Sequence, residues 1–123
     1  MADAPIRILL VDDHELIRSG LGSVIDLEPD LSVIGTAGNV SEALGRYEEM
    51  KPAVVIADLQ LPDGTGLDIV RTIRGQSDTV GLVVLTMHSG DEQIFAAMQA
   101  GASGFVGKDA PATEVVKAAR HAA

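Results

Sequence analysis

The chain contains no cysteine, which excludes disulfide bonds, thiolate chemistry and cysteine-based zinc sites. Aromatic residues are scarce, with only two Phe and one Tyr, so the core is expected to consist mainly of Val, Ile, Leu and Ala. No apolar run approaches the roughly 20 residues that a transmembrane helix needs. The only early apolar run is interrupted by Asp12 and Asp13, so the sequence predicts no signal peptide and a cytoplasmic location.

Basic residues are also few, because nine Lys and Arg stand against eighteen Asp and Glu, and the formal net charge is −9. Proteins that bind nucleic acids draw much of their affinity from Lys and Arg placed on phosphates. DNA should therefore repel this chain, and any DNA binding would need a domain outside it. The length of 123 residues suits a single domain covering residues 1–123.

Short apolar runs alternate with segments of helical periodicity along the whole chain. The predicted strands are Ile6–Val11, Leu31–Ala37, Val54–Asp58, Leu82–Thr86 and Gly104–Gly107. The predicted helices begin at His14, Val40, Gly66, Ser89 and about Pro111. This alternation predicts an α/β fold, a flavodoxin-like doubly wound (βα)5 domain with a five-stranded parallel sheet. The first, third and fourth strands are the most apolar and should be central, which matches the strand order 2-1-3-4-5.

Three details of the helices can be predicted in the same way. Ser89 and Glu92 have the spacing of a capping box at the start of the fourth helix. That helix is expected to bury Ile94, Ala97 and Met98 and to end at Gly101. The last helix is expected to have Pro111 in its first turn, to run through Glu114 to Ala123 and to bury Val115, Val116 and Ala119.

Polar residues stand at the carboxyl ends of four predicted strands: Asp12, Asp13, Asp58, Thr86 and Lys108. Parallel strands place these ends at one edge of the sheet, where ligands bind in open α/β folds. Three carboxylates in one place repel each other unless a cation neutralises them. Mg²⁺ suits a site with a few carboxylates and water, and the main-chain carbonyl of Gln60 is placed to add an oxygen.

The same edge has the groups that phosphoryl transfer needs. A carboxylate such as Asp58 can attack phosphorus and form an acyl phosphate. Lys108 offers a positive charge for a phosphoryl oxygen, and Thr86 offers a hydroxyl donor. Because positioning and charge neutralisation account for most of the catalysis of phosphoryl transfer, the pattern predicts phosphorylation of Asp58.

The whole chain resembles the receiver domain of bacterial two-component response regulators, most closely the NarL/LuxR-type subfamily. The resemblance rests on four stretches: residues 8–14 (ILLVDDH), 58–66 (DLQLPDGTG), 85–86 (LT) and 101–108 (GASGFVGK). It implies that Asp58 is the phosphoacceptor. It implies further that Asp13, Asp58 and the Gln60 carbonyl bind Mg²⁺ with help from Asp12, that Lys108 pairs with the phosphoryl group, and that Thr86 and Phe105 form a switch pair.

The resemblance also implies partners. A sensor histidine kinase would donate the phosphoryl group, and phosphorylation would favour a homodimer. A helix-turn-helix domain would follow the chain, and the chain itself would turn over no substrate as an enzyme does. In one respect the sequence departs from many receivers, in which Pro, often in a cis bond, follows the active-site Lys; here Asp109 follows Lys108.

Three alternatives were weighed against this interpretation. A haloacid-dehalogenase-type phosphatase would have a second Asp two residues after its nucleophile, but Gln60 stands there and the chain is too short for a cap domain. A flavodoxin-type redox carrier needs a phosphate loop after its first strand, where Asp12 and Asp13 would repel a flavin phosphate. A receiver that only binds partners, without phosphorylation, stays open to a phosphotransfer assay.

The histidines were considered as metal ligands and set aside. His14 and His88 lie near the predicted edge, but no two histidines have the His-x-x-x-His spacing of a zinc site, and His121 is expected in solvent. Gln60 and His88 each lie two residues beyond a site residue. We therefore expect them to tune the lifetime of the phosphoryl group by hindering or orienting the attacking water.

Overall fold

The computed structural model describes residues 4–87 and 91–123. Its strands are β1 (Ile6–Val11), β2 (Leu31–Ala37), β3 (Val54–Asp58), β4 (Gln60–Leu61), β5 (Gly64–Thr65), β6 (Gly81–Thr86) and β7 (Gly104–Gly107). Its helices are α1 (Glu15–Asp26), α2 (Val40–Met50), α3 (Gly66–Arg74), α4 (Asp91–Ala100) and α5 (Ala112–Ala122). Among these residues, no helix has the length and apolar character to cross a membrane.

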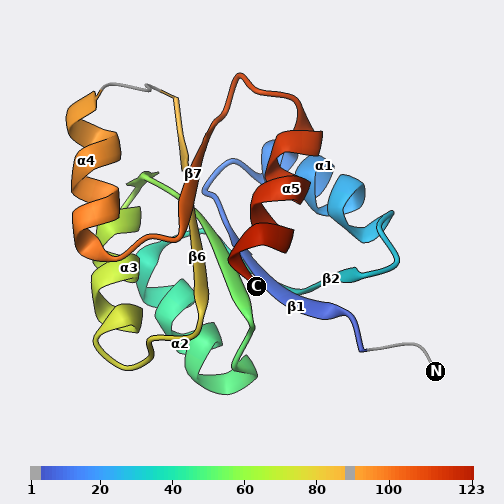
Figure 1. The fold of residues 1–123 in the computed structure, drawn as a ribbon, viewed down its shortest axis with the longest axis horizontal. Coiled ribbons are helices and arrows are strands. Elements are labelled where there is room, and N and C mark those ends of the chain that lie inside the picture. The colour runs from blue at the N-terminus through green and yellow to red at the C-terminus, as the bar shows by residue number, and fades with distance from the viewer. Residues whose placement is uncertain (1–3, 88–90) are drawn as a thin grey trace.

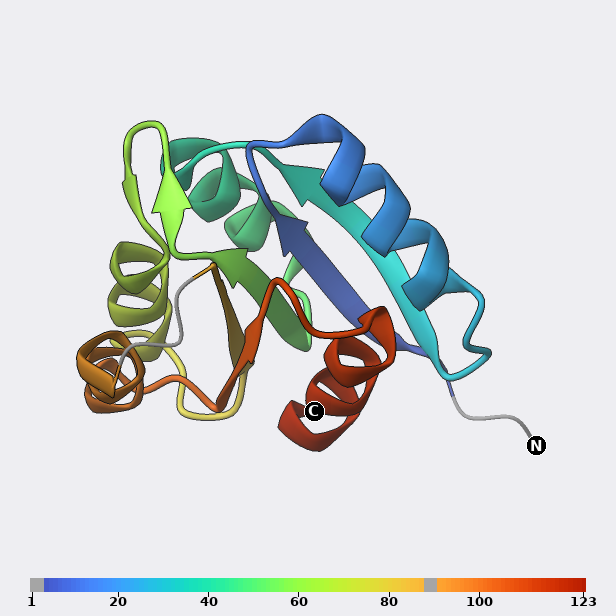
Figure 2. The ribbon, with the colours of Figure 1, turned by 90° about the horizontal axis from the view of Figure 1, so that it is seen from above.

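Five of the strands form one parallel sheet in the order β2-β1-β3-β6-β7. This is the predicted order 2-1-3-4-5, with β6 and β7 as the fourth and fifth strands, so the predicted fold is confirmed. Figure 1 shows α3 and α4 on one side of β6 and β7, with α5 and α1 on the other. Seen from above in Figure 2, the same helices flank the twisted sheet.

The central strands carry apolar residues on both faces because each face is buried in a separate core. Alternate residues of β1, β3 and β6 face α2, α3 and α4: Leu9, Val11, Val55, Ala57, Leu82 and Val84. The intervening residues face α1 and α5: Ile8, Leu10, Val54, Ile56, Val83 and Leu85. All twelve side chains are at most 2% exposed, so aliphatic residues fill most of both layers, and Tyr47 is an aromatic residue of the first core.

Several element boundaries differ from the prediction. β4 and β5 form a two-stranded antiparallel hairpin where a loop was predicted, since strands of two residues are too short to show a periodic pattern. β6 begins one residue early, at Gly81. α5 begins at Ala112, with Pro111 as its N-cap residue, and ends at Ala122 instead of Ala123.

The inner face of α4 was predicted only in part. Ala97 is 1% exposed as predicted, but Ile94 is only partly buried, and Met98 is 48% exposed and does not belong to the core. The helix ends where predicted, because Gly101 has a φ of 110°, a conformation that favours glycine. Ser89 lies outside the described residues, so the capping box with Glu92 stays a prediction.

Candidate functional site

Three carboxylates meet at the carboxyl edge of the sheet. In the register of β1 and β3, Val11 lies opposite Ala57, so the next residues, Asp12 and Asp58, leave the sheet side by side. Asp12 is fully buried and Asp58 is 2% exposed. Together with Asp13 and His14, they offer ligand atoms that all lie within 4.8 Å of one another. The fold therefore builds the acidic pocket that the strand ends predicted.

Lys108 reaches this pocket from the end of β7. Its backbone N–H donates to the Thr86 carbonyl at 2.8 Å, which fixes the start of the β7–α5 connection beside β6. Its Nζ donates to Asp58 Oδ2 at 2.7 Å and lies 3.0 Å from Asp12 Oδ2, and its side chain is only 7% exposed. The described residues contain no cis peptide bond, so the Lys108–Asp109 bond is trans.

The charge of Lys108 is set by two opposing influences. Burial alone would lower its pKa, but contacts with the Asp58 and Asp12 carboxylates outweigh burial and raise the pKa above its ordinary value. The side chain is therefore a permanent ammonium ion at neutral pH. It holds together two carboxylates that would otherwise repel each other.

The backbone around Asp58 is held tightly. Asp58 Oδ1 accepts from the Gln60 N–H at 3.2 Å, and the Leu59 N–H donates to the Leu85 carbonyl at 2.9 Å. Gly66, the first residue of α3, packs so closely that a Cβ there would lie 2.5 Å from the Asp58 carbonyl oxygen. Because Gly66 has no Cβ, the start of α3 can pack directly against the end of β3.

Thr86 and Phe105 have different environments. Thr86 ends β6, is 4% exposed, and its hydroxyl donates to Gln93 Oε1 on α4 at 3.2 Å. Phe105 in β7 is 39% exposed, so it is not a core residue. Gln60 is exposed at the start of β4, and His88 lies outside the described residues.

Three further residues contact the site or its supports; His14 was expected near this edge of the sheet but without a role, and Arg18 and Gln93 were not predicted. His14 Nδ1 lies 3.2 Å from Asp12 Oδ1 and 3.1 Å from Asp13 Oδ1. Arg18 Nη1 donates to the Asp12 carbonyl at 2.8 Å. Gln93, as described, accepts from Thr86. His14 and Arg18 could have been suspected from their places just after the paired acids, whereas no sequence signal links Gln93 to Thr86.

Asp63, in the hairpin formed by β4 and β5, has a structural role in the support of the site. Its carboxylate accepts from the N–H groups of Val40 at 2.7 Å and Ser41 at 3.0 Å, at the start of α2. These hydrogen bonds lower the pKa of Asp63 below its ordinary value. The hairpin that follows Asp58 is thereby tied to α2.

The donor set fits a hard divalent cation. Asp12 Oδ2 is buried, has no hydrogen-bond partner among the described residues, and lies 3.0 Å from the Lys108 ammonium. A buried carboxylate oxygen beside two further carboxylates is the oxygen-rich environment that Mg²⁺ prefers. The acidic cluster Asp12, Asp13 and Asp58 is therefore typical of a receiver metal site.

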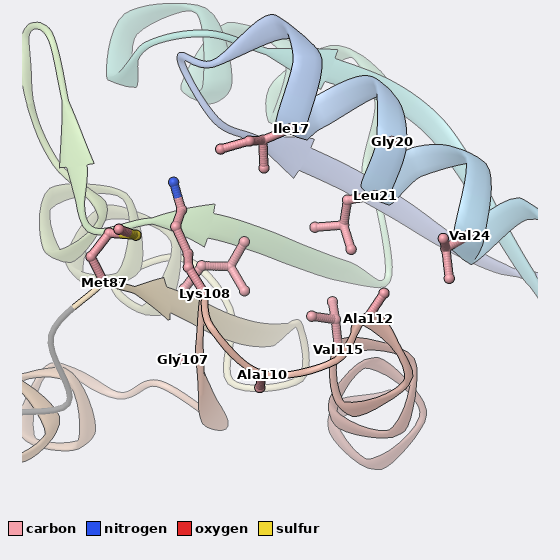
Figure 3. A pocket seen from close by; sticks show the side chains of 11 residues that line it. Ile17, Gly20, Leu21, Val24, Met87, Gly107, Lys108, Ala110, Ala112 and Val115 are labelled. Atoms are coloured by element: carbon pink, nitrogen blue, oxygen red, sulfur yellow. The ribbon is translucent and has the colours of Figure 1, made fainter.

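An apolar groove of about 450 Å³ borders the site. Its walls come from α1, from the end of β6, and from the β7–α5 connection with the start of α5, and they include Ile17, Leu21, Val24, Met87, Lys108 and Val115. Figure 3 shows the Lys108 side chain at one end of the groove, with Ile17, Leu21 and Val24 of α1 across from Val115 and Ala112. The groove thus connects the acidic pocket with the surface between α1 and α5.

Comparison with known proteins defines the class of protein. The model of the response regulator receiver domain matches residues 8–120, so the chain belongs to this family of two-component signalling domains. It is similar to the DNA-binding transcriptional activator DevR/DosR of Mycobacterium tuberculosis, with 37% identity over 94% of this chain and 53% of that protein. It is also similar to the nitrate/nitrite response regulator protein NarL of Escherichia coli, with 32% identity over 97% of this chain and 55% of that protein.

Solved structures agree with this assignment. A two-component response regulator of the LuxR family from Aurantimonas sp. has a TM-score of 0.87 at 36% identity, covering 93% of this chain and 81% of that chain. A signal receiver domain from Mycobacterium tuberculosis has a TM-score of 0.89 at 28% identity, covering 94% of each chain. The predicted membership in the NarL/LuxR-type group is thus confirmed. The chain spans about half the length of the curated relatives it matches.

Proposed function

We propose that this chain is a phosphorylation-controlled switch in which Asp58 accepts a phosphoryl group from a phosphorylated histidine of a sensor kinase. The observation that supports this most directly is the environment of Asp58. It is a nearly buried carboxylate whose Oδ2 lies 2.7 Å from a lysine ammonium, at the rim of an acidic cluster. One face of the cluster can bind a cation, and Lys108 supplies a second positive charge beside the same carboxylate.

In the proposed reaction, a carboxylate oxygen of Asp58 attacks phosphorus while the bond from phosphorus to the imidazole nitrogen of the kinase breaks. The electron pair of that bond returns to the imidazole, and Asp58 becomes an acyl phosphate. Asp13, Asp58 and the Gln60 carbonyl would hold Mg²⁺, with Asp12 beside them. The ion would neutralise phosphoryl oxygens during the transfer.

Lys108 has two roles in this proposal. Before the reaction its ammonium lies beside both Asp58 and Asp12, which offsets the repulsion within a cluster of like charges. After the reaction its ammonium can follow the negative charge from the carboxylate to a phosphoryl oxygen, because the new oxygens lie two bonds beyond the carboxylate oxygen that attacked. This exchange of partners is the first structural consequence of phosphorylation.

The output would pass through Thr86 and Phe105. A phosphoryl oxygen can accept from the Thr86 hydroxyl and draw it inward, which would open space for the half-exposed Phe105 ring. Phosphorylation would then favour the packing that makes this additional hydrogen bond, as a population shift. Gln60 and His88 would tune the lifetime of the acyl phosphate through their access to the attacking water.

We further propose that the chain is the regulatory part of a longer transcription regulator. Two relatives have names that identify them as transcription regulators or response regulators, and each extends well beyond the region of similarity. Because the net charge of this chain is −9, we expect a separate helix-turn-helix domain, and not the receiver, to contact DNA. In this arrangement the receiver controls DNA binding through its protein surface.

Mass spectrometry of the chain incubated with acetyl phosphate tests the phosphorylation, with and without Mg²⁺. Wild-type protein should gain the mass of one phosphoryl group only with the metal, and Asp58→Ala should gain none. Asp63→Asn is the matched control, since Asp63 lies in the same loop but bonds to the start of α2. Phosphorylation of Asp58→Ala at the wild-type rate would overturn the assignment, and a wild-type protein that gains no mass would favour a receiver that only binds partners.

A further inference from the structure

His14 is held against the acidic cluster by two separate contacts. Its backbone N–H donates to Asp12 Oδ1 at 2.8 Å, which turns the chain at the start of α1. Its ring Nδ1 then lies 3.2 Å from Asp12 Oδ1 and 3.1 Å from Asp13 Oδ1. The His14 side chain is 60% exposed and that of Asp13 is 33% exposed, so the imidazole lies at the solvent-accessible part of the cluster, whereas Lys108 is 7% exposed.

These separations match the spacing of neighbouring ligands on an octahedral ion. For metal–ligand bonds of about 2.1 Å, two ligand atoms at right angles are about 3.0 Å apart. The Nδ1 atom stands at nearly this distance from both carboxylate oxygens, and all the ligand atoms of the cluster lie within 4.8 Å of one another. The imidazole can therefore bind the same ion as the two carboxylates with little movement.

We propose that His14 supplies an imidazole nitrogen to the ion bound at the acidic cluster and biases the site from Mg²⁺ toward divalent ions of the first transition row, such as Mn²⁺ and Co²⁺. This inference rests on the metal site of the proposed function and adds a ligand to it. Mg²⁺ binds oxygen ligands and retains water, so a nitrogen ligand adds little to its affinity. Imidazole nitrogen suits transition ions, and affinity rises along the row from Mn²⁺ to Cu²⁺.

A different role for His14 would produce the same distances. A ring N–H shared between the two carboxylates would orient them without touching the ion. That arrangement predicts no nitrogen in the coordination sphere and equal effects of a His14 substitution on Mg²⁺ and Co²⁺. The two roles therefore differ in a spectroscopic signal and in a ratio of affinities, which do not depend on the rate of phosphorylation.

Electron spin-echo envelope modulation of the Mn²⁺-loaded chain gives the first test. Wild-type protein should show modulation from one directly bound nitrogen, and labelling of histidine with ¹⁵N should change its frequencies. His14→Gln should lose the signal, whereas His121→Gln, an exposed substitution in the last helix, should retain it. The proposal would be overturned if the wild type showed no nitrogen modulation. It would also be overturned if the signal were lost in His88→Gln but retained in His14→Gln.

Competition titrations give the second test. His14→Gln should weaken Co²⁺ binding by roughly tenfold or more, the usual scale of changes around a metal site, while Mg²⁺ binding changes less than about twofold. An equal loss for both ions would show that His14 only orients the carboxylates and would overturn the inference. Labelling with acetyl phosphate distinguishes a failure of this inference from a failure of the proposed function. If nitrogen is bound to the ion but Asp58 is not phosphorylated, His14 is a ligand and the proposed phosphotransfer is wrong. If Asp58 is phosphorylated but no nitrogen is bound, the proposed function holds and the ligand role of His14 is wrong.

Discussion

At the scale of single residues, the site depends on one cation placed between two buried acids. Asp12 and Asp58 are buried to 2% exposure or less, and Lys108 Nζ lies within 3.0 Å of both. Removing one partner of a buried ion pair leaves an uncompensated charge, which costs much more than losing an exposed pair. The stability of this edge of the sheet should therefore respond strongly to the charge of Lys108.

Lys108→Met should lower the free energy of unfolding by about 3 kcal/mol in the absence of divalent ions. Lys117→Met is the control, because Lys117 is 73% exposed and only pairs with Glu114 on the surface, so its loss should change stability by less than about 1 kcal/mol. Urea unfolding in EDTA measures both values. Added Mg²⁺ should restore part of the loss in Lys108→Met if the ion can replace the ammonium as a neutralising charge.

The pH dependence of this contribution follows from the raised pKa of Lys108 in the folded protein. A folded pKa above the unfolded value gives stability that is fully present below the unfolded value, near pH 10.4, and is lost as pH rises through the folded pKa. The difference in stability between the wild type and Lys108→Met should thus be constant around neutral pH and shrink in strongly alkaline solution. A difference that shrinks near neutral pH would contradict the raised pKa.

The residues of the site differ in how far the sequence could predict them. Asp12, Asp58, Thr86 and Lys108 could be placed together because a parallel sheet forces the carboxyl ends of its strands to one edge. Gln93 could not be placed, because its contact with Thr86 depends on how α4 is positioned and on one side-chain rotamer. The spacing of the histidines does not predict a ligand at His14, because no two of them form a His-x-x-x-His pair, whereas the structure places the His14 ring against carboxylates.

At the scale of helices and strands, Gly66 shows what the fold requires beside Asp58, and Gly45 provides a comparison. A Cβ at Gly66 would lie 2.5 Å from the Asp58 carbonyl oxygen, whereas a Cβ at Gly45 in α2 meets nothing within 4 Å. Gly66→Ala should therefore destabilise the protein by about 1–3 kcal/mol, because backbone atoms must move apart. Gly45→Ala should stabilise it by up to about 1 kcal/mol through helix propensity. Thermal unfolding checks both, and a stabilising Gly66→Ala would contradict the close packing of α3 on β3.

The contact between β6 and α4 can be changed to test the proposed switch. The Thr86 hydroxyl donates to Gln93 Oε1 at 3.2 Å, and in the proposed mechanism the same hydroxyl turns toward the phosphoryl group. A hydrogen bond of about 0.5–1.5 kcal/mol would then favour the resting state, so Gln93→Ala should raise the active population severalfold before phosphorylation. NMR shifts of Phe105 measure this population. Gln99→Ala removes an exposed Gln from the same helix and should leave the shifts at their wild-type values.

The sequence predicted the main elements better than their connections. The buried strands β1, β3 and β6 are apolar on both faces, and this pattern is hard to mistake for any other structure. The hairpin of β4 and β5 went unpredicted because its position depends on Asp63 bonding to the start of α2, a contact between segments more than twenty residues apart. Met98 was placed in the core by helical spacing alone, which cannot tell how wide the buried stripe of α4 is.

At the scale of the whole molecule, the surface between α1 and α5 combines three features. The apolar groove lies there, and its walls include Lys108 and Met87, the latter directly after Thr86. Leu16 on α1 is 86% exposed. Arg120 of α5 donates through two nitrogens to Asp30 at 2.7 and 2.9 Å, which lowers the pKa of Asp30 and ties α5 to the segment after α1. The groove therefore reaches Lys108 of the acidic pocket and lies between two helices, of which α5 is tied to the segment after α1.

These features favour the groove as the surface through which phosphorylated copies form the expected homodimer. A two-fold dimer needs one self-complementary surface, and α1 provides both an exposed apolar side chain, Leu16, and a wall of the groove. In the proposed mechanism Lys108 would exchange Asp58 for a phosphoryl oxygen and change one end of the groove, so the affinity of the groove for a second copy should depend on phosphorylation. The charge of −9 disfavours association in general, which makes apolar contact the main source of binding energy.

Gly20→Arg tests this surface with little risk to the fold. Gly20 lines the groove (Figure 3), and a Cβ there meets nothing within 4 Å, so the larger side chain should fill the groove without disturbing the core of α1. Light scattering after gel filtration of the acetyl phosphate-treated chain should show a dimer for the wild type and a monomer for Gly20→Arg. Gly45→Arg is the matched control, since Gly45 has the same free space on α2 but does not line the groove, and it should dimerise like the wild type. A Gly20→Arg protein that dimerises normally would place the interface elsewhere, whereas loss of dimerisation in both variants would point to the added positive charge instead of the filled groove.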